Sequence, residues 1–137
     1  MIEVIPTTVD DPRVQAIVDA GGLPTPVDRA HVNTVILGLE DGTPYAFAGG
    51  FLWGALPVLE HFAVRPGFVT YRRMRRIADA YAQTLFDQGE PLLVTSVRHA
   101  NPHARPLRAL LRSWPAERYA DDGTRDWWVH YREETRS

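Results

Sequence analysis

The stretch "FAVRPGFVTYRRMRRIADA", residues 62–80, joins an apolar run to a helical segment through the turn Arg65-Pro66-Gly67. From Thr70 onward apolar residues recur at helical spacing, at Met74, Ile77, Ala78, Tyr81, Ala82, Leu85 and Phe86. Gly89 is placed to end this helix, and a short apolar strand is expected over 92–97. A strand, a long helix and a second strand in this order predict a βαβ unit with parallel strands.

The segments before this unit indicate a helix and three strands. Asp10-Asp11-Pro12 favours a helix start, Gly21-Gly22 a helix end, and the prolines of residues 23–26 a rigid loop. Strands are expected over 35–40, 45–53 and 56–64. Asp41-Gly42 is a strong hairpin signal between the first two, and Gly49-Gly50 suggests a bulge in the second.

The segments after the unit complete a single domain. Asn101-Pro102 is expected to open a second amphipathic helix, which Pro115 ends, and strands over 116–120 and 125–132 flank Asp121-Asp122-Gly123. The predicted fold class is α+β, with a mixed, mostly antiparallel sheet, a βαβ unit and flanking helices. Residues 1–137 form one domain, as the length suggests.

Composition excludes several kinds of chemistry. The chain has 137 residues, no cysteine and a net charge of -2, so disulfides, thiolate nucleophiles and thiolate metal sites are excluded. All 15 basic residues are arginine, which rules out lysine-dependent mechanisms. No leader peptide and no apolar run long enough for a membrane span are recognised. We therefore expect a cytoplasmic protein with no membrane partner.

Two blocks carry a resemblance to a known family. "LEHFAVRPGF", residues 59–68, resembles the fourth strand and its exit in the Gcn5-related N-acetyltransferase (GNAT) superfamily, and "NPHARPLRALL", residues 101–111, resembles its Asn-x-x-Ala segment and following helix. The resemblance spans nearly the whole chain. It implies acetyl-CoA as acyl donor and direct attack of an amine acceptor on the thioester.

The resemblance also implies a coenzyme site. The pantetheine arm of the coenzyme would pair with the fourth strand at Phe62, Ala63 and Val64, like an added strand. The pyrophosphate would rest on amides at the start of the central helix. The residues assigned to this contact are Thr70, Tyr71, Arg72, Arg73 and Met74.

The sequence departs from the family pattern at two places. Arg72 and Met74 stand where the family's pyrophosphate loop has small residues, so the usual close approach of glycine backbone to phosphate is lost. Arg72 or Arg73 could supply charge-assisted contacts instead. Arg108 stands where many members carry the tyrosine that protonates the leaving thiolate.

Glu60 is the candidate catalytic residue. On a regular strand it shares a face with Phe62 and Val64, and a carboxylate among apolar neighbours can act as general base toward the amine. A strand-end glutamate that reaches solvent or pairs with an arginine is the alternative. His61 points to the opposite face and is interpreted as a packed or hydrogen-bonded histidine. No metal site is expected, because Asn101-Pro102 separates His99 from His103.

Two further assignments keep an alternative. Asn101 either hydrogen-bonds the coenzyme, as its family position implies, or caps the next helix. The arginines at 72, 73, 75 and 76 form a solvated face, or Arg72 or Arg73 contacts a coenzyme phosphate. A nucleic-acid patch is the third reading of these arginines, but the net charge makes a nucleic-acid partner unlikely in this chain.

Two classes of function therefore compete. The first is a divergent acyl-CoA-dependent N-acetyltransferase-like enzyme. The second follows from a narrower similarity, to GNAT-like phage proteins of the internal virion protein A type, which share a basic central helix and an acidic final hairpin. It implies a catalytically inactive phage protein that acts in virion morphogenesis or host interaction through a phage or host protein partner.

Overall fold

The computed structural model of the chain describes residues 1–21 and 27–133. These residues form one mixed sheet with helices on both faces. The elements in chain order are β1 (Ile2–Thr7), α1 (Pro12–Asp19), β2 (Thr34–Glu40), β3 (Thr43–Trp53), β4 (Leu56–Val64), α2 (Tyr71–Asp87), β5 (Leu92–Arg98), α3 (Ala104–Ser113), β6 (Glu117–Asp121) and β7 (Arg125–Tyr131).

The sheet has seven strands in the order β1-β2-β3-β4-β5-β7-β6. Every neighbouring pair is antiparallel except β4 and β5, which are parallel and are connected by α2. The predicted α+β class, the mixed and mostly antiparallel sheet and the βαβ unit are all confirmed. No described helix is both long enough and apolar enough to cross a membrane.

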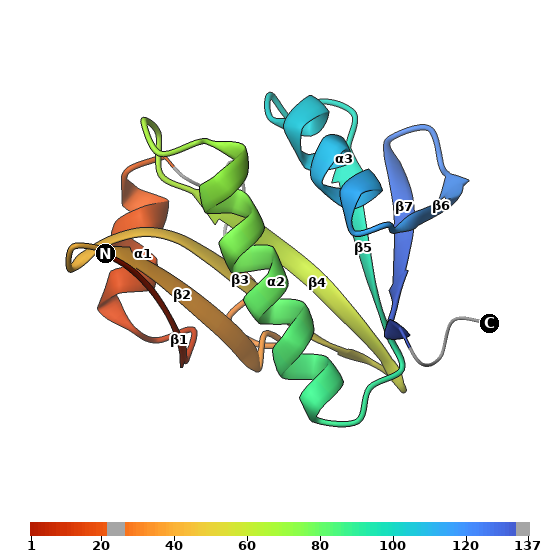
Figure 1. Cartoon of the computed structure of the whole chain (residues 1–137), viewed down its shortest axis with the longest axis horizontal. Helices are drawn as coiled ribbons and strands as arrows, with labels where there is room; N and C mark the ends of the chain where they lie inside the picture. Colours follow the sequence, from red (N-terminus) through yellow and green to blue (C-terminus); the bar gives the residue numbers. More distant parts are fainter. Residues whose placement is uncertain (22–26, 134–137) are drawn as a thin grey trace.

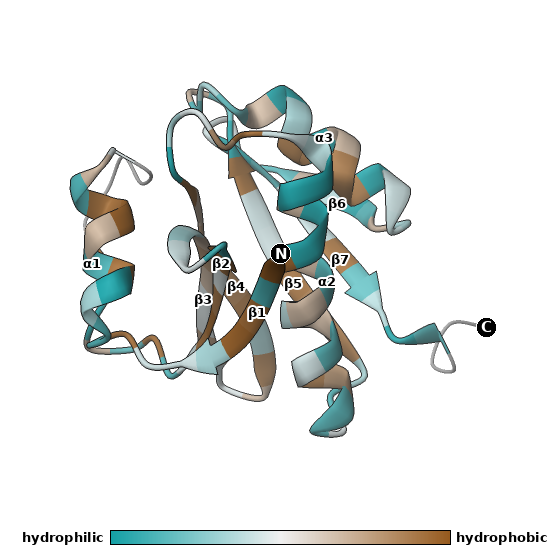
Figure 2. Ribbon diagram, turned by 60° about the vertical axis from the view of Figure 1, so that its left-hand side comes forward, coloured by the Kyte–Doolittle hydropathy of each residue, from teal (hydrophilic) through white to brown (hydrophobic). Residues whose placement is uncertain are grey.

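Helices cover the two faces of the sheet unequally. Figure 2 shows α1 on one face and α2 and α3 on the other. Under α2 the core includes Tyr45, Met74, Ile77 and Tyr81, and a second cluster under α1 draws its buried sheet residues from β2, β3 and β4. A third, smaller cluster joins α3 to β5 and β7. The α1 face of β5 and β7 contributes no buried residue to the α1 cluster.

The strand β1 was missed by the sequence analysis, which expected no element before residue 10. Its residues pair antiparallel with β2 in continuous register, from Ile2 opposite Glu40 to Thr7 opposite Val35. Ile2 and Val4 pack on the α2 side while Ile5 packs on the α1 side. Its sequence IEVIPT carries Pro6 and two adjacent apolar residues, Val4 and Ile5, which interrupt a strand pattern, and only its pairing with β2 establishes it.

Turn and cap signals located the other boundaries well. Asp41 and Gly42 both have positive φ, 51° and 82°, as a two-residue I′ hairpin requires. Asp11 caps α1, accepting a hydrogen bond from the Arg13 amide. Gly21 has a φ of 88° just after this helix. The predicted helix-ending Gly22 and the predicted loop over 23–26 lie outside the described residues.

The helix α2 matches its prediction closely. Thr70 is extended and its hydroxyl accepts from the Arg73 amide at 3.3 Å, which caps the first turn. At the other end Gly89, with a φ of 92°, follows the last helical turn. The predicted apolar stripe is buried from Met74 to Leu85, and Phe86 packs at its edge.

Candidate active site

The parallel strands β4 and β5 separate after a short contact. Their ladder consists of Val58 opposite Val94 and Leu59 opposite Thr95, and the Thr95 hydroxyl donates to the Leu59 carbonyl at 3.1 Å. Beyond this point β4 continues to Val64 paired only with β3, and β5 continues paired only with β7. Figure 1 shows the two strands diverging toward their C-terminal ends. Among the described residues, one edge of β4 beyond Leu59 therefore has no neighbouring strand.

A β-bulge lies in β4 where the separation begins. In the register with β3, Gly50 faces Leu59 and Gly49 faces His61, so Glu60 is the extra residue. The glycine pair correctly predicted an irregularity, but the extra residue belongs to β4 rather than to β3. The bulge reverses the alternation of side chains between the two faces of the sheet. Leu59 and Phe62 therefore both pack on the α2 side, although residues three apart on a regular strand point to opposite faces.

The bulge alters the predicted surroundings of Glu60. The prediction that Glu60 shares an apolar face with Phe62 and Val64 assumed a regular strand. Phe62 and Val64 do pack on the α2 side and Ala63 on the α1 side, whereas Glu60 is exposed at the bulge. Glu60 is thus a solvent-accessible carboxylate next to the opening between the strands.

Gly50 makes the bulge possible through close packing. A Cβ atom at this position would lie 2.0 Å from the Val58 carbonyl oxygen and 2.1 Å from the Tyr81 hydroxyl. That hydroxyl donates to the same carbonyl at 3.3 Å in the buried core. Burial raises the pKa of Tyr81, so it remains a neutral hydrogen-bond donor.

A cleft occupies the opening between β4 and β5. Its volume is about 90 Å³, a narrow slot beside the roughly 300–1,000 Å³ of typical small-molecule sites. Five of the predicted site residues line it, namely Glu60, Phe62, Val64, Met74 and Asn101. Sequence reasoning missed other residues of its lining, including Thr95, Ser96, Arg98, His103, Leu107 and Arg125. These lie on β5, on β7, and on α3 and the turn before it, outside the decisive stretch of sequence.

His61 also lines the cleft, and its environment fixes its role. It is 6% exposed, and its Nε2 accepts from the Asp28 amide at 3.0 Å. Burial lowers the pKa of His61 and outweighs the opposite effect of Glu60 and Asp28, while Arg98 also lowers it. The imidazole is therefore neutral with one lone pair already used, as predicted for a hydrogen-bonded structural histidine.

The start of α2 borders one end of the cleft. Gly67 has a φ of 90°, and Thr70 caps the Arg73 amide while its carbonyl accepts from the Met74 amide. The amides of Tyr71 and Arg72 have no acceptor among the described residues, as expected for the first positions of a helix. Such amides with the helix dipole attract anions.

The arginines of this turn point away from the cleft. Arg73 forms an ion pair with Glu40 at 3.0 Å and lies over the Phe68 ring at 5.2 Å. Together with Thr70 and Arg72 it lines a separate shallow depression beside β1. Arg72 is exposed. Of the residues assigned to pyrophosphate, only Met74, 1% exposed, has its side chain in the cleft wall.

Tyr71 connects α2 to the end of α3. Its hydroxyl donates to Ser113 at 2.7 Å and accepts from Arg75 at 3.0 Å. These hydrogen bonds lower the pKa of Tyr71. Arg75 in turn pairs with Asp79, which accepts from the Trp114 indole at 2.7 Å. A polar network thus joins the two helices that flank the opening.

Asn101 acts as a turn residue before α3. Its side-chain oxygen accepts from the His103 amide at 2.8 Å, and its carbonyl accepts from the Ala104 amide. The helix begins at Ala104, slightly later than the Asn-Pro signal suggested, and His103 is its N-cap residue. The capping alternative explains the Asn101 oxygen, while its position in the cleft lining keeps the coenzyme alternative open.

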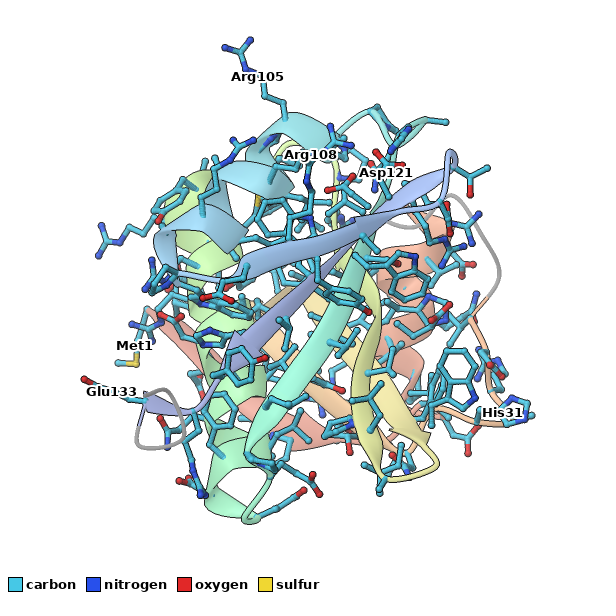
Figure 3. All side chains as sticks on the ribbon, turned by 90° about the vertical axis from the view of Figure 1, so that its right-hand side faces the viewer. Met1, His31, Arg105, Arg108, Asp121 and Glu133 are labelled. Atoms are coloured by element: carbon cyan, nitrogen blue, oxygen red, sulfur yellow. The ribbon has the colours of Figure 1, made fainter. Side chains whose placement is uncertain are left out.

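Arg108 forms an ion pair with a buried carboxylate. Its guanidinium pairs with Asp126 at 2.7 Å, and Asp126 is 1% exposed and also accepts from the Trp128 indole. Burial acts to raise the pKa of Asp126, but the hydrogen bonds from Arg108 and Trp128 outweigh it and hold the pKa below its usual value. Figure 3 shows Arg108 turned toward the final hairpin, whereas Arg105 projects into solvent. Arg108 therefore anchors β7 to α3.

The described residues contain no group of histidine, aspartate and glutamate side chains that could hold a metal ion. His99 lies near Asp121 at 3.2 Å and Asp126 at 3.7 Å, and His103 lies in the cleft lining.

Comparison with solved structures identifies the fold. The chain is similar to a putative GNAT-family acetyltransferase from Desulfovibrio desulfuricans, with a TM-score of 0.76, 15% identity, and coverage of 96% of this chain and 99% of that one. It is similar to the PaiA N-acetyltransferase of Thermoplasma acidophilum in complex with coenzyme A, with a TM-score of 0.74, 9% identity, and coverage of 96% of this chain and 99% of that one. It is also similar to the ribosomal-protein-S18-alanine N-acetyltransferase of Escherichia coli, with a TM-score of 0.70, 18% identity, and coverage of 94% of this chain and 91% of that one.

These similarities define the class of protein by its fold. The chain has the α+β fold of GNAT acetyltransferases over nearly its whole length. No protein-family model matches the sequence, and no curated protein does. At these identities the likeness extends to the fold, so the activity has to be argued from the site itself.

Proposed function

We propose that this protein is an N-acyltransferase that uses an acyl-coenzyme A thioester, acetyl-CoA in the simplest case, and an amine acceptor. The observation that carries the proposal is the separation of β4 from β5 after Leu59, with a cleft in the opening. An unpaired strand edge can bind an extended amide-containing chain by strand addition. The pantetheine arm of coenzyme A is such a chain.

The coenzyme would bind along β4 and the start of α2. The backbone of Phe62, Ala63 and Val64 would pair with the pantetheine amides, and Phe62, Val64 and Met74 would contact its apolar parts. The free amides of Tyr71 and Arg72 would receive the pyrophosphate, and Thr70 would keep the turn in place. Because the cleft is narrow, its half-buried side chains would move aside as the arm enters.

The acyl transfer would proceed by direct attack. The acceptor nitrogen forms a bond to the thioester carbonyl carbon, the carbon–sulfur bond breaks, and the amine loses a proton. Glu60, exposed beside the opening, would accept this proton directly or through a water molecule. The leaving thiolate would be protonated from solvent, since Arg108 is held by Asp126.

The competing proposal is a non-catalytic protein of the same fold. Arg108 in the family's tyrosine position is bound to Asp126, Arg72 and Met74 replace small residues, and the slot is narrow. These observations favour a protein that has kept the fold and lost catalysis, while the phage role in virion morphogenesis or host interaction rests on the sequence resemblance alone. A cytoplasmic location suits either proposal.

Titration with acetyl-CoA separates the two proposals. Ligand at 100 times its Kd should raise the free energy of unfolding by about 2.7 kcal/mol, measured by thermal shift and calorimetry. Val69→Trp, which places an indole in the cleft lining, should remove this effect. Ala109→Trp, at an exposed position of α3 outside that lining, is the matched control and should keep it.

Each result of the acetyl-CoA titration decides between the two proposals. Absence of binding to the folded wild-type protein at millimolar acetyl-CoA overturns the enzyme proposal and favours the non-catalytic one. If binding occurs, Arg73→Ala tests the phosphate role predicted for Arg73. Unchanged affinity would show that its ion pair with Glu40 is its whole function.

A further inference from the structure

Two arginines lie side by side on the cleft wall opposite the expected coenzyme. Arg98 ends β5 and Arg125 begins β7, and the two are directly opposite in the antiparallel register. Both line the cleft together with Glu60 and Ser96. The neighbouring register pair, Val97 and Asp126, is buried on the α3 side. Because side chains alternate along a strand, Arg98 and Arg125 project from the other face of the sheet.

On that face, at the end of β5, the side chain of Arg98 is accessible. The buried sheet residues under α1 come from β2, β3 and β4, and Arg98 is exposed. His61, whose Nε2 contacts Asp28 on the α1 side, responds electrostatically to both Glu60 and Arg98. One carboxylate and two guanidinium groups therefore surround the end of the opening that faces away from α2 and α3.

The two guanidinium groups have no carboxylate partner in the described part of the chain. The ion pairs of residues 1–21 and 27–133 do not include Arg98 or Arg125. Arg125 donates weakly to Ser96 at 3.3 Å and lies over the Trp127 ring at 5.4 Å. Like charges directly opposite on paired strands are unfavourable. An anion between them would relieve this repulsion and could accept paired hydrogen bonds.

We infer that the acceptor is a small amine that also carries an anionic group, which Arg98 and Arg125 bind while Glu60 faces the ammonium. The inference rests on the proposed acyltransferase function and names the acceptor class for that site. A purely cationic or neutral amine would meet two uncompensated positive charges at the opening. A zwitterionic amine matches the order of charges from Glu60 to Arg98 and Arg125.

Two matched amine sets test the inference. β-Alanine and O-phosphoethanolamine carry a carboxylate and a phosphate, respectively, while propylamine and putrescine carry no anion. Release of coenzyme A thiol from acetyl-CoA can be followed with a thiol reagent without background, because the chain has no cysteine. The anion-bearing set should have a kcat/KM at least tenfold above the other set, and its better member tells a carboxylate site from a phosphate site.

Variants then assign the effect to the arginines. Arg98→Gln should raise the KM for the anion-bearing amines about tenfold or more and leave kcat within threefold, whereas the KM for propylamine should fall because one repelling charge is removed. The KM of Arg98→Lys for the anion-bearing amines should lie between those of the wild type and Arg98→Gln, since lysine keeps the charge but loses the planar donor pair. Arg105→Gln, at a residue that projects into solvent, is the matched control. Arg125→Gln is the second test if one variant fails to fold.

A binding measurement keeps this inference separate from the proposed function. In the absence of coenzyme, O-phosphoethanolamine should raise the melting temperature of the wild type but not of Arg98→Gln. If acetyl-CoA fails to bind while this shift is seen, the acyltransferase proposal falls and the anion site stands. If acetyl-CoA binds but propylamine and putrescine are equally good acceptors, or if Arg98→Gln weakens coenzyme binding instead, the inference is overturned.

Discussion

The two sides of β4 contrast sharply. Toward β3 the strand is paired from Leu56 to Val64, interrupted only by the bulge at Glu60. Toward β5 it is paired at Val58 and Leu59 alone. The paired side is closed by Gly50 and Tyr81 in close packing, and the free side borders the cleft. A single strand thus provides both rigidity and an open edge, and changes on each side should have different consequences.

Gly50→Ala should have the largest effect because it breaks the closed side. The new methyl would overlap the Val58 carbonyl at 2.0 Å, and backbone cannot move away as a flexible side chain can. We expect a loss of at least about 3 kcal/mol in the free energy of unfolding, measured by urea denaturation.

The neighbouring Gly49→Ala is the matched control. Its Cβ would lie 3.2 Å from a methyl carbon of Val32, so the expected cost is about 1 kcal/mol. Equal stability losses for the two variants would show that the close packing at Gly50 is not what holds the bulge.

Asp126→Asn should have the next largest effect, at the anchor of the strands beyond the opening. It removes the charge partner of Arg108, and breaking a buried pair costs about 3 kcal/mol. Arg108 is partly exposed, so the loss should fall somewhat below this value.

The pH dependence of stability checks the same residue. The folded-state pKa of Asp126 lies below its usual value, near 3.9 in the unfolded chain. Its contribution is therefore present above about pH 4 and lost as pH falls through the folded pKa. The decline in unfolding free energy below pH 4 should be shallower in Asp126→Asn than in the wild type. Parallel curves would contradict this role.

Thr95→Val should have a smaller effect, at the last link between β4 and β5. It removes the hydroxyl that donates to the Leu59 carbonyl and leaves that buried acceptor without the bond. The expected cost is about 1–2 kcal/mol, measured by urea denaturation. Ser96→Ala, one residue along the strand, should change stability by less than about 0.5 kcal/mol. A neutral Thr95→Val would mean that the ladder alone sets where the strands separate.

Glu60→Gln should have the smallest effect on stability because the side chain is exposed. A change within about 0.5 kcal/mol is expected. Acyl transfer at neutral pH should nevertheless fall about 100-fold if Glu60 is the general base, with coenzyme binding preserved. Full activity in the variant would remove Glu60 from the mechanism.

The sequence was informative where local chemistry decides the structure. Asp41-Gly42 and Gly89 located a hairpin and the end of α2, because turns and caps depend on few neighbouring residues, and the change to helical spacing from Thr70 located its start. The helical apolar stripe of residues 74–86 and the βαβ order gave the fold class. The strand β1 was missed because Pro6 and the adjacent Val4 and Ile5 interrupt its local pattern, so that its pairing with β2 alone defines it.

The candidate site was predicted only in part. Glu60, Phe62, Val64, Met74 and Asn101 were named in advance and do line one cleft. Arg73 instead pairs with Glu40 at the end of β2. The sequence gives no local sign that this residue lies beside the first turn of α2. Arg98 and Arg125 could not be associated from sequence, since only the β5–β7 register places them opposite each other.

The sequence by itself determined the order of elements from α1 onward, the central βαβ unit and the lack of thiol and lysine chemistry. These features follow from residue types and from spacing within one element. The tertiary structure alone decided that Glu60 is the bulged residue, that Arg108 is held by Asp126, and that two arginines face the opening. Each of these depends on which residue of one strand or helix lies beside which residue of another, and no local pattern encodes that register.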